Sequence, residues 1–187
     1  MNSSGRIFDV VGAAVGLAIV SPLLLICAVL VRTDSPGPAF LRQARIGQNG
    51  RLFTCVKLRT MYSDTGDRPT HEVGRSAVTR IGHFLRRTKL DELPQLWNVL
   101  AGDMNFVGPR PCLPSQVALI EARRERGVLA MRPGITGVSQ IAGVDMSDPE
   151  RLAKLDATYR RSVANDLRII VATVLGAGQG DKTAGGL

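Results

Sequence analysis

The sequence is poor in aromatic residues, cysteine and acidic residues. Of its 187 residues, five are Phe, two are Tyr and one is Trp, so stacking of bases or sugar rings on aromatic side chains is not its main binding device. Its three scattered cysteines, Cys27, Cys55 and Cys112, fit no metal-binding spacing and argue against a disulfide framework. Asp and Glu number 16 against 24 Lys and Arg, which gives a net charge of +8. This charge favours anionic partners: nucleic acid, phosphorylated ligands or acidic lipid.

Charge is absent from the stretch Val10–Val31. At about 1.5 Å per residue, a straight helix of this length crosses a bilayer. Ser21 and Pro22 lie at its middle, and because proline disrupts helical hydrogen bonding we expect a kink there. Each half then covers about half of the hydrocarbon thickness, which also fits a bent helix that enters and leaves on the same face. Hydropathy leaves both topologies open, while the charged remainder of the chain is expected in the cytoplasm.

The rest of the sequence predicts a mixed α+β domain that is mostly helical. Ala39–Ile46 and Leu52–Met61 are expected as strands of a small hairpin, because the segment between them contains Asn49-Gly50, a favoured turn. Helices are expected over Thr79–Thr88, Asp91–Leu100, Ser115–Leu129, Asp148–Ser162 and Asp166–Leu175. The apolar face of the last helix is consistent with core or with a membrane interface. We expect three parts: a membrane-anchoring helix in residues 1–35, a main domain in 36–175 and a mobile tail in 176–187.

Two adjacent acidic residues are the main candidates for a catalytic site. Asp91 and Glu92 stand where a helix is expected to begin, a position in which acids stabilise helices with no further role. Several basic residues surround them in the sequence: Arg80, Arg86, Arg87, Lys89, Arg110 and Arg132. Arginines in rigid Pro- and Gly-rich loops suit phosphate oxygens. An acid beside such arginines indicates phosphoryl transfer, in which one carboxylate attacks phosphorus and the other holds Mg²⁺.

Eight short motifs then occur in one order along nearly the whole chain. They are Arg6-Ile7-Phe8-Asp9, Ser21-Pro22, Gly37-Pro38, Lys57-Leu58-Arg59-Thr60-Met61, Leu90-Asp91-Glu92-Leu93-Pro94-Gln95-Leu96, Gly102-Asp103-Met104, Phe106–Pro111 and Arg132–Gly137. In this order the chain resembles the bacterial sugar transferases called monotopic phosphoglycosyl transferases. It is similar to their small class, which consists of the minimal catalytic unit.

The resemblance implies an activity and a location. It implies transfer of a sugar phosphate from a UDP-sugar to undecaprenyl phosphate, with release of UMP, as the first membrane step of surface glycan assembly. The main domain would be catalytic and lie at the cytoplasmic face of the bacterial inner (plasma) membrane. It would be anchored by a re-entrant helix broken at Ser21-Pro22, with amphipathic helices at the interface.

The resemblance also implies roles for individual residues. Asp91 would be the nucleophile that forms an aspartyl phosphosugar intermediate, and Glu92 would be the ligand of the Mg²⁺ cofactor. Candidates for binding the substrate phosphates are Arg86, Arg110, Arg132, Lys57, Arg59 and Arg80. Residues 143–149 and 178–181 are similar to a subset that acts on N-acetylated deoxysugars. Val138 departs from the pattern, because many members have an aromatic residue there.

Other interpretations of the sequence predict different behaviour. A membrane-anchored module that binds anionic lipid or nucleic acid would explain the charge and the apolar stretch, and would leave Asp91 as a helix cap. Such a module would bind with steep salt dependence and show no turnover. A spanning protein with an assembly role is a further alternative. The scarcity of aromatic residues argues against nucleic acid as a partner, and homo-oligomerisation stays open.

Overall fold

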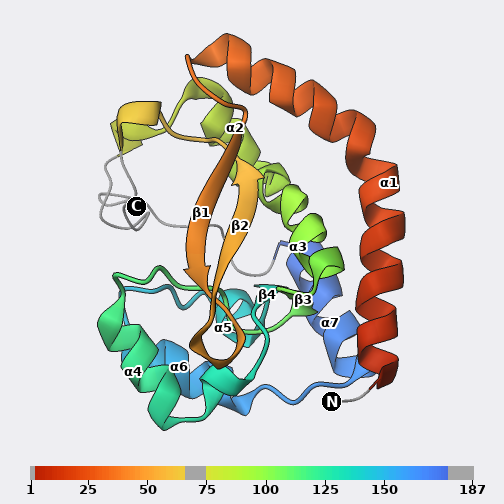
Figure 1. Ribbon diagram of the computed structural model, residues 1–187, viewed down its shortest axis with the longest axis vertical. Coiled ribbons are helices and arrows are strands. Elements are labelled where there is room, and N and C mark those ends of the chain that lie inside the picture. Colours follow the sequence, from red (N-terminus) through yellow and green to blue (C-terminus); the bar gives the residue numbers. More distant parts are fainter. Residues whose placement is uncertain (1–2, 66–74, 177–187) are drawn as a thin grey trace.

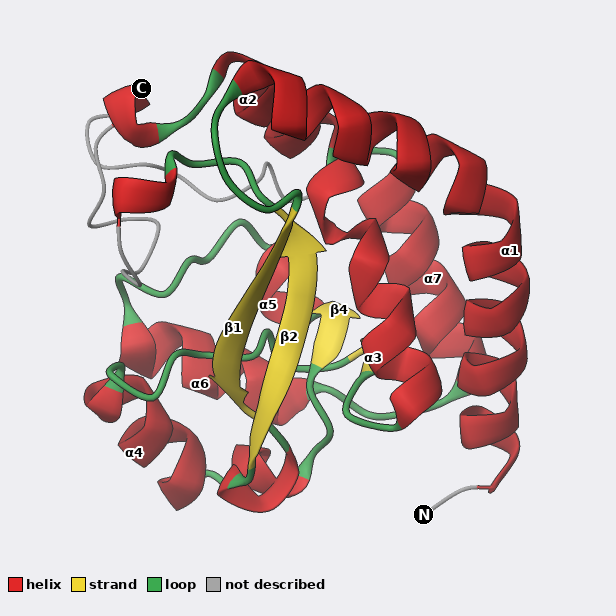
Figure 2. Ribbon diagram, turned by 45° about the horizontal axis from the view of Figure 1, so that its top comes forward, coloured by secondary structure: helices red, strands yellow, loops and turns green. Residues whose placement is uncertain are grey.

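The structure is a computed structural model that describes residues 3–65 and 75–176. Figures 1 and 2 show a long helix, α1, along the outer side of the molecule, with α3 and α7 between it and a central hairpin. The helices are α1 (Ser3–Asp34), α2 (Arg80–Thr88), α3 (Leu96–Ala101), α4 (Val117–Glu125), α5 (Val138–Ile141), α6 (Pro149–Thr158) and α7 (Val163–Val174). The strands are β1 (Phe40–Ile46), β2 (Leu52–Leu58), β3 (Asn105–Val107) and β4 (Gly134–Thr136). This confirms a mostly helical α+β chain, while residues 177–187 of the expected tail lie outside the described part.

Helix α1 continues through the expected break. Pro22 lies inside the helix, and the Ser21 hydroxyl donates to the Ala18 carbonyl over 2.9 Å. Figure 1 shows the helix axis bending partway along its length. A proline removes one backbone hydrogen bond and bends a helix without ending it when neighbouring turns remain intact. The expected kink is therefore a bend within one continuous helix.

Only a narrow stripe of α1 packs against the domain. Ala13 packs with the α3 side, and Leu24, Cys27 and Val31 pack with residues of β2 and α2. The exposed large hydrophobic residues of the helix are Ile7, Val11, Val15, Ile19, Leu23, Leu25, Ile26, Val29 and Leu30. By length and composition this helix is long and apolar enough to cross a membrane. An apolar face of this size suits lipid rather than water.

Both ends of α1 are tied to the same domain. The Arg6 guanidinium donates to the carbonyls of Val99 and Leu100, at the end of α3, over 2.8 and 3.3 Å. At the other end, Asp34 accepts a hydrogen bond from the Ile81 backbone N–H, at the start of α2, over 3.0 Å. The helix therefore lies along the domain over its whole length.

The hairpin forms as its turn residues predict. Strands β1 and β2 pair antiparallel from Phe40 opposite Leu58 to Ile46 opposite Leu52, so β2 ends three residues earlier than expected. Asn49 and Gly50 both take positive φ angles, 56° and 76°, as tight Asn-Gly hairpin turns require.

A buried asparagine connects the hairpin to α3. The Asn98 side chain accepts from the Val56 N–H and donates to the Thr54 carbonyl, at 3.0 and 2.7 Å. Asn98 is buried, so these bonds satisfy a side chain that would otherwise be costly to desolvate. They fix α3, which directly follows the segment containing Asp91 and Glu92, against β2.

A second, smaller sheet joins two segments that the sequence analysis treats as loops. Strand β3 pairs parallel with β4, with Asn105 opposite Gly134 and Val107 opposite Thr136. The backbones approach so closely that a Cβ atom on Gly134 would lie 2.1 Å from the Gly108 nitrogen. Glycine is therefore required where these two loops touch, and the loops become one rigid unit.

The remaining helices lie near their expected positions, but α4 and α6 are shorter than predicted and α7 begins three residues before its predicted start. Helices α4 and α6 end about four residues before the predicted limits. Helix α7 begins after Ser162, whose hydroxyl caps it by accepting from the Asn165 N–H. Ile169 of α7 is buried, whereas Leu167 and Val171 are exposed. The apolar residues of α7 therefore fall into two groups: Ile169 packs in the core, and Leu167 and Val171 face outward.

Candidate active site

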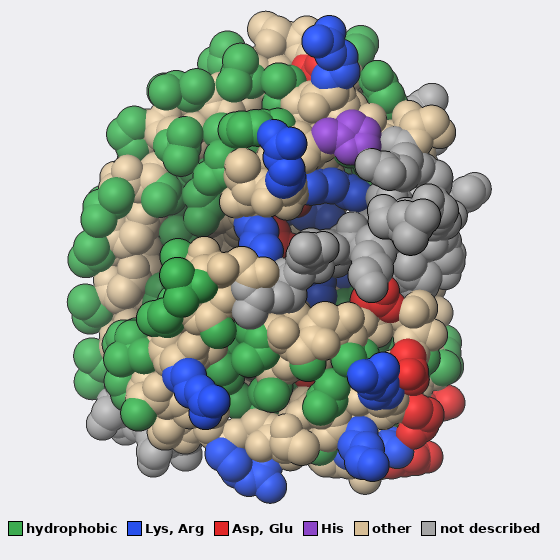
Figure 3. Space-filling model, turned by 180° about the vertical axis from the view of Figure 1, so that it is seen from behind, with side chains coloured by type: hydrophobic (Ala, Val, Ile, Leu, Met, Phe, Trp, Pro, Cys, Tyr) green, Lys and Arg blue, Asp and Glu red, His purple; other side chains and the backbone are tan. Residues whose placement is uncertain are grey.

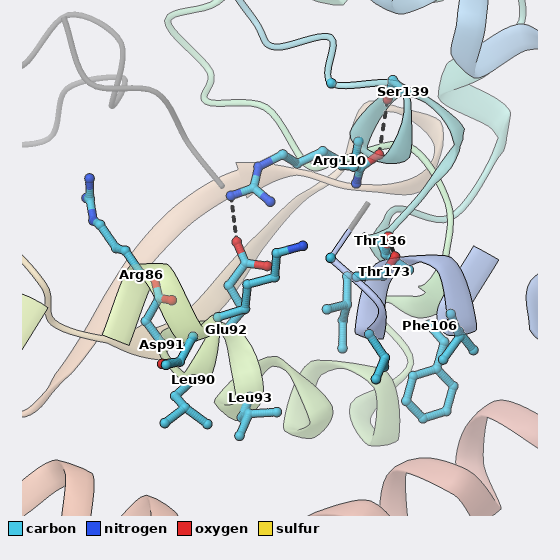
Figure 4. A pocket seen from close by; sticks show the side chains of 18 of the residues that line it. Arg86, Leu90, Asp91, Glu92, Leu93, Phe106, Arg110, Thr136, Ser139 and Thr173 are labelled. Carbon is cyan, nitrogen blue, oxygen red and sulfur yellow. Dashed lines mark hydrogen bonds and ion pairs between the residues drawn. The ribbon is translucent and has the colours of Figure 1, made fainter. Parts of the chain in front are cut away.

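A cavity of about 710 Å³ opens beside the segment that follows α2. Its walls come from the end of α2, from η5 (Leu90–Gln95), from the loop after β3, from α5 and from the end of α7. Four of the predicted site residues line it: Arg86, Asp91, Glu92 and Arg110 (Figure 4). In Figure 3, basic and acidic side chains gather in a recess, and hydrophobic side chains cover the neighbouring edge formed by α1.

Asp91 is positioned by a tight turn. Helix α2 ends at Thr88, and Lys89 adopts a left-handed conformation with φ of 58° and ψ of 16°. This conformation is unfavourable for a residue with a Cβ atom, and such strain is typical of functional sites. The next residues form η5, a 3₁₀ helix, and only from Leu96 onward is the segment α-helical. The helix expected from Asp91 therefore exists, but its first turns are 3₁₀ because Pro94 disfavours α-helical geometry in the residue before it.

The structure does not use Asp91 as an N-cap. The cap position of η5 is Lys89, which makes no side-chain cap hydrogen bond, and Asp91 lies within the first turn. Asp91 is only 8% exposed, and it lines the cavity. Asp91 therefore does not occupy the N-cap position that was considered for it.

Two arginines from different elements line the same cavity as the acidic pair. Arg110, in the loop after β3, forms an ion pair with Glu92 at 2.7 Å, and both side chains are about one fifth exposed. Arg86, in the last turn of α2, donates from Nε to the Thr60 hydroxyl at 2.9 Å. Partial burial strengthens these interactions relative to pairs in water. The result is a cavity wall with adjacent carboxylates and guanidinium groups.

Lys57 lies close to this wall without lining the cavity. Burial raises the pKa of the Cys55 thiol, and the positive charges of Arg45, Lys57 and Arg110 oppose the increase. The negative charge of Glu92 reinforces it. These four charged groups therefore lie around the same buried thiol on β2. The predicted role of Lys57 in phosphate binding stays a prediction.

Arg59 is placed away from the cavity. Its side chain is buried, and its guanidinium donates to the carbonyls of Val31, Ser35, Pro36, Gly37 and Pro38 and to the hydroxyls of Ser35 and Ser63. These acceptors belong mainly to the turn that links α1 to β1. The guanidinium therefore holds that turn, which differs from the phosphate-binding role expected for it.

Arg132 and Arg80 also lie outside the cavity. Burial lowers the pKa of Arg132, and the nearby charges of Arg6 and Arg161 lower it further. Arg132 therefore belongs to a cluster at the start of α1, where Arg161 pairs with Asp9 at 2.5 Å. Arg80 is exposed at the start of α2. A role in phosphate binding stays a prediction for Arg132 and Arg80.

The sequence of the whole chain is similar to that of known proteins. The sequence profile described as bacterial sugar transferase matches residues 2–179. The chain belongs to the bacterial sugar transferase family. A UDP-glucose:undecaprenyl-phosphate glucose-1-phosphate transferase of Caulobacter vibrioides is 40% identical over 180 residues, which cover 90% of this chain and 67% of that protein.

Other relatives have similar identity to this chain but are covered to very different extents. An undecaprenyl-phosphate glucose phosphotransferase of Komagataeibacter xylinus is 40% identical over 184 residues, 90% of this chain but 35% of that protein. An exopolysaccharide production protein of Sinorhizobium fredii, ExoY, is 38% identical over 192 residues, 91% of this chain and 84% of that protein. This family member therefore spans about a third of one relative and most of another.

Sequence reasoning missed one wall of the cavity in this bacterial sugar transferase. Ser139 and Gln140 of α5 and Thr173 of α7 line the cavity, and the hydroxyls of Thr136 and Thr173 lie 2.6 Å apart. The apolar lining residues are Leu90, Leu93, Leu96, Phe106, Ile135, Val144, Met146, Leu152, Ile170 and Val174. Five of the apolar residues, Leu90, Leu93, Leu96, Phe106 and Ile135, lie within the sequence motifs, whereas Leu152, Ile170 and Val174 look like ordinary core positions that no local signal marks. The cavity therefore combines charged and apolar lining residues.

The acidic pair fits the magnesium ion that the family resemblance implies. Among residues 3–65 and 75–176, no group of three or more His, Cys, Asp or Glu side chains could hold a metal by itself. Magnesium in phosphoryl-transfer sites is held by one or two carboxylates together with substrate phosphates and water. Asp91 and Glu92 on one wall supply such a donor set, which is completed only by a phosphorylated ligand.

Proposed function

We propose that the chain transfers a hexose 1-phosphate from a UDP-sugar to undecaprenyl phosphate, with formation of a polyprenyl diphosphosugar and release of UMP. One observation carries the proposal: a single cavity is lined by Asp91, Glu92, Arg86 and Arg110 together with many apolar side chains. The charged side chains suit a diphosphate, and the apolar side chains suit the lipid acceptor. The names of the relatives support these substrates and a role in assembling surface glycans.

The reaction proceeds by two displacements at one phosphorus atom. A carboxylate oxygen of Asp91 attacks the phosphorus that bears the sugar, the bond to the oxygen bridging the two phosphates breaks, and UMP leaves. An oxygen of undecaprenyl phosphate then attacks the same phosphorus, and the bond to Asp91 breaks to restore the carboxylate. Because Asp91 holds the phosphosugar in between, a water-soluble donor and a membrane-bound acceptor use the same site in turn.

The positive charges in the cavity reduce the repulsion between the attacking carboxylate and the diphosphate. A carboxylate that approaches a diphosphate is repelled by its negative charge, and Arg86 and Arg110 oppose that repulsion. Glu92 would hold the magnesium ion, which when bound neutralises charge on the diphosphate oxygens. The ion pair between Glu92 and Arg110 keeps both groups at the same edge of the cavity.

The contacts of α1 support a re-entrant anchor at the cytoplasmic face of the inner membrane. Arg6 and Asp34, near opposite ends of the helix, both bind the same domain. A spanning helix would carry one of these charged ends across the bilayer and away from its partner. The proposal predicts that Asn2→Cys and Arg32→Cys react from the same side of sealed vesicles with an impermeant maleimide. Labelling from opposite sides would rule out the re-entrant arrangement.

Release of UMP from purified full-length protein tests the function. The donors are UDP-glucose, UDP-galactose and a UDP-linked N-acetylated deoxysugar, each with magnesium and with or without undecaprenyl phosphate. We expect lipid-dependent UMP release from one donor, loss of this activity in Asp91→Asn, and no loss in Glu121→Gln, which changes an exposed carboxylate of α4. Without acceptor, mass spectrometry should find the phosphosugar on the peptide containing Asp91. Silence with every donor would refute the transferase activity, and substantial turnover by Asp91→Asn would remove Asp91 as nucleophile.

A further inference from the structure

A buried ion pair lies directly behind the cavity wall. Arg123 of α4 and Asp156 of α6 are 3% and 1% exposed. The Nε and Nη2 atoms of Arg123 donate to Asp156 Oδ2 over 3.1 and 2.7 Å. The remaining Nη1 group donates to the main-chain carbonyl of Arg110 over 2.8 Å. One guanidinium therefore bridges a buried carboxylate and the backbone of a residue that lines the cavity.

Asp156 also reaches a second wall of the same cavity. Its other oxygen, Oδ1, accepts a hydrogen bond from the Ser139 hydroxyl over 2.7 Å. Ser139 lies in α5 and lines the cavity. Both oxygens of one buried carboxylate are thus engaged, and each connects to a different part of the site. Burial raises the pKa of Asp156, while the charge of Arg123 and the bond from Ser139 act in the opposite direction.

Joining α4 to α6 does not by itself require this buried pair. The same two helices are joined at the surface by Arg126 and Glu150, which lie 2.5 Å apart. A buried ion pair generally adds little stability over apolar residues of similar size, because desolvation of both charges offsets their attraction. What distinguishes Arg123 from Arg126 is the hydrogen bond to the Arg110 carbonyl. That contact is the structural reason to look for a role beyond helix packing.

We propose that Arg123, held by Asp156, is a positioning residue that fixes Arg110 for binding of the donor diphosphate. The contact to the Arg110 carbonyl restrains the loop after β3, and this restraint keeps the Arg110 guanidinium in its ion pair with Glu92. Substituting groups that orient the residues around a metal commonly costs about 10- to 100-fold in affinity or activity. The inference rests on the proposed function only in taking Arg110 as a phosphate-binding residue.

Binding of UDP to the full-length protein, measured by calorimetry with and without magnesium, tests this positioning role. Arg123→Lys keeps the positive charge beside Asp156, but a single ammonium group cannot reproduce the guanidinium fork that also reaches the Arg110 carbonyl. We expect UDP to bind about 10-fold more weakly in the presence of magnesium. The matched control, Arg126→Lys, alters the surface pair between the same helices and should leave UDP affinity unchanged.

A double-mutant cycle separates positioning from general stability. If Arg123 acts through Arg110, Arg123→Lys should cause little further loss of UDP affinity in an Arg110→Lys background. Full multiplication of the two losses would overturn the proposal, as would unchanged affinity in Arg123→Lys or absence of UDP binding by the wild type. If Arg123→Lys fails to fold, Arg123→Gln combined with Asp156→Asn removes both buried charges at once, and the same loss of affinity is expected. Wild-type protein that binds UDP but releases no UMP would refute the transferase proposal alone.

Discussion

At the scale of single residues, Glu92 offers the most direct test of the metal site. Its ion pair with Arg110 at 2.7 Å holds one carboxylate oxygen at the edge of the cavity. Glu92→Gln preserves the size of the side chain but removes the charge that favours magnesium. We expect turnover to fall about 10- to 100-fold and half-maximal activation to need more magnesium. A magnesium titration of UMP release measures both, and an unchanged titration would exclude Glu92 as the metal ligand.

A second residue, Asp166 of α7, predicts how stability depends on pH. It is buried and accepts a hydrogen bond from the Tyr159 hydroxyl at 2.6 Å. Burial raises the pKa of Asp166 above its ordinary value of 3.8, although the bond from Tyr159 and the charge of Arg161 act against the increase. Because the folded chain then holds this proton more tightly, the stability it contributes is fully present below pH 3.8 and is lost as the pH rises through the raised pKa.

Replacing the carboxyl of Asp166 by an amide tests this dependence. Asp166→Asn cannot titrate, so its melting temperature relative to wild type should increase as the pH rises from about 4 to 7. Glu121→Gln, on the exposed face of α4, should show no such trend. A difference between Asp166→Asn and wild type that stays constant with pH would mean that the Asp166 carboxyl titrates normally.

At the scale of elements, local signals decided which parts of the fold were predictable. The Asn49-Gly50 turn predicted the hairpin, and the expected starts of α2 and α6, at Thr79 and Asp148, coincide with the residues that cap these helices. Strands β3 and β4 have only three residues each, which is too short to show an alternation of apolar and polar residues. They also pair with each other across a long stretch of chain, so no local turn signal predicts them. The same reasoning explains Arg59: its motif is recognisable in sequence, but the turn that its guanidinium holds is a tertiary feature.

The packing of α1 on β3 gives a prediction about coupling between the anchor and the cavity. A Cβ atom on Gly12 would lie 2.9 Å from the Phe106 ring, and Phe106 lines the cavity. We expect Gly12→Ala to displace this ring, to destabilise the chain by about 1–3 kcal/mol, and to slow turnover several-fold. On Gly16 the corresponding Cβ atom would lie 3.5 Å from Leu96, an ordinary contact.

Gly16→Ala is therefore the matched control for Gly12→Ala. It places the same methyl group on the same helix without a clash, and alanine favours helix over glycine by about 0.5–1 kcal/mol. Its melting temperature should equal or exceed that of wild type, with turnover retained. Equal behaviour of the two variants would show that Phe106 does not transmit contacts of α1 to the cavity.

At the scale of the whole molecule, the site is an assembly that no single segment contains. The sequence motifs and the basic residues near them pointed to Arg86, Asp91, Glu92 and Arg110, and the structure brings these four to one cavity. The apolar lining comes from η5, α3, α6, α7, the strands β3 and β4 and the loop after α5, so it is assembled from segments that lie far apart in the sequence. Which predicted arginines face the cavity depends on tertiary packing, and Arg59 and Arg132 lie elsewhere for that reason.

The outward faces of α1 and α7 lead to a prediction about how the lipid acceptor is reached. Figures 1 and 2 both show α7 beside α1, and Leu167 and Val171 of α7 are exposed although apolar. If these residues lie in the membrane interface, Val171→Asp should hinder turnover with undecaprenyl phosphate in nanodiscs several-fold, because a charge there disfavours the apolar boundary. Formation of the phosphosugar intermediate from the soluble donor should remain normal. Ala118→Asp, on the exposed surface of α4, should affect neither step. Equal loss of both steps in Val171→Asp would mean that α7 supports the fold of the cavity rather than its access to lipid.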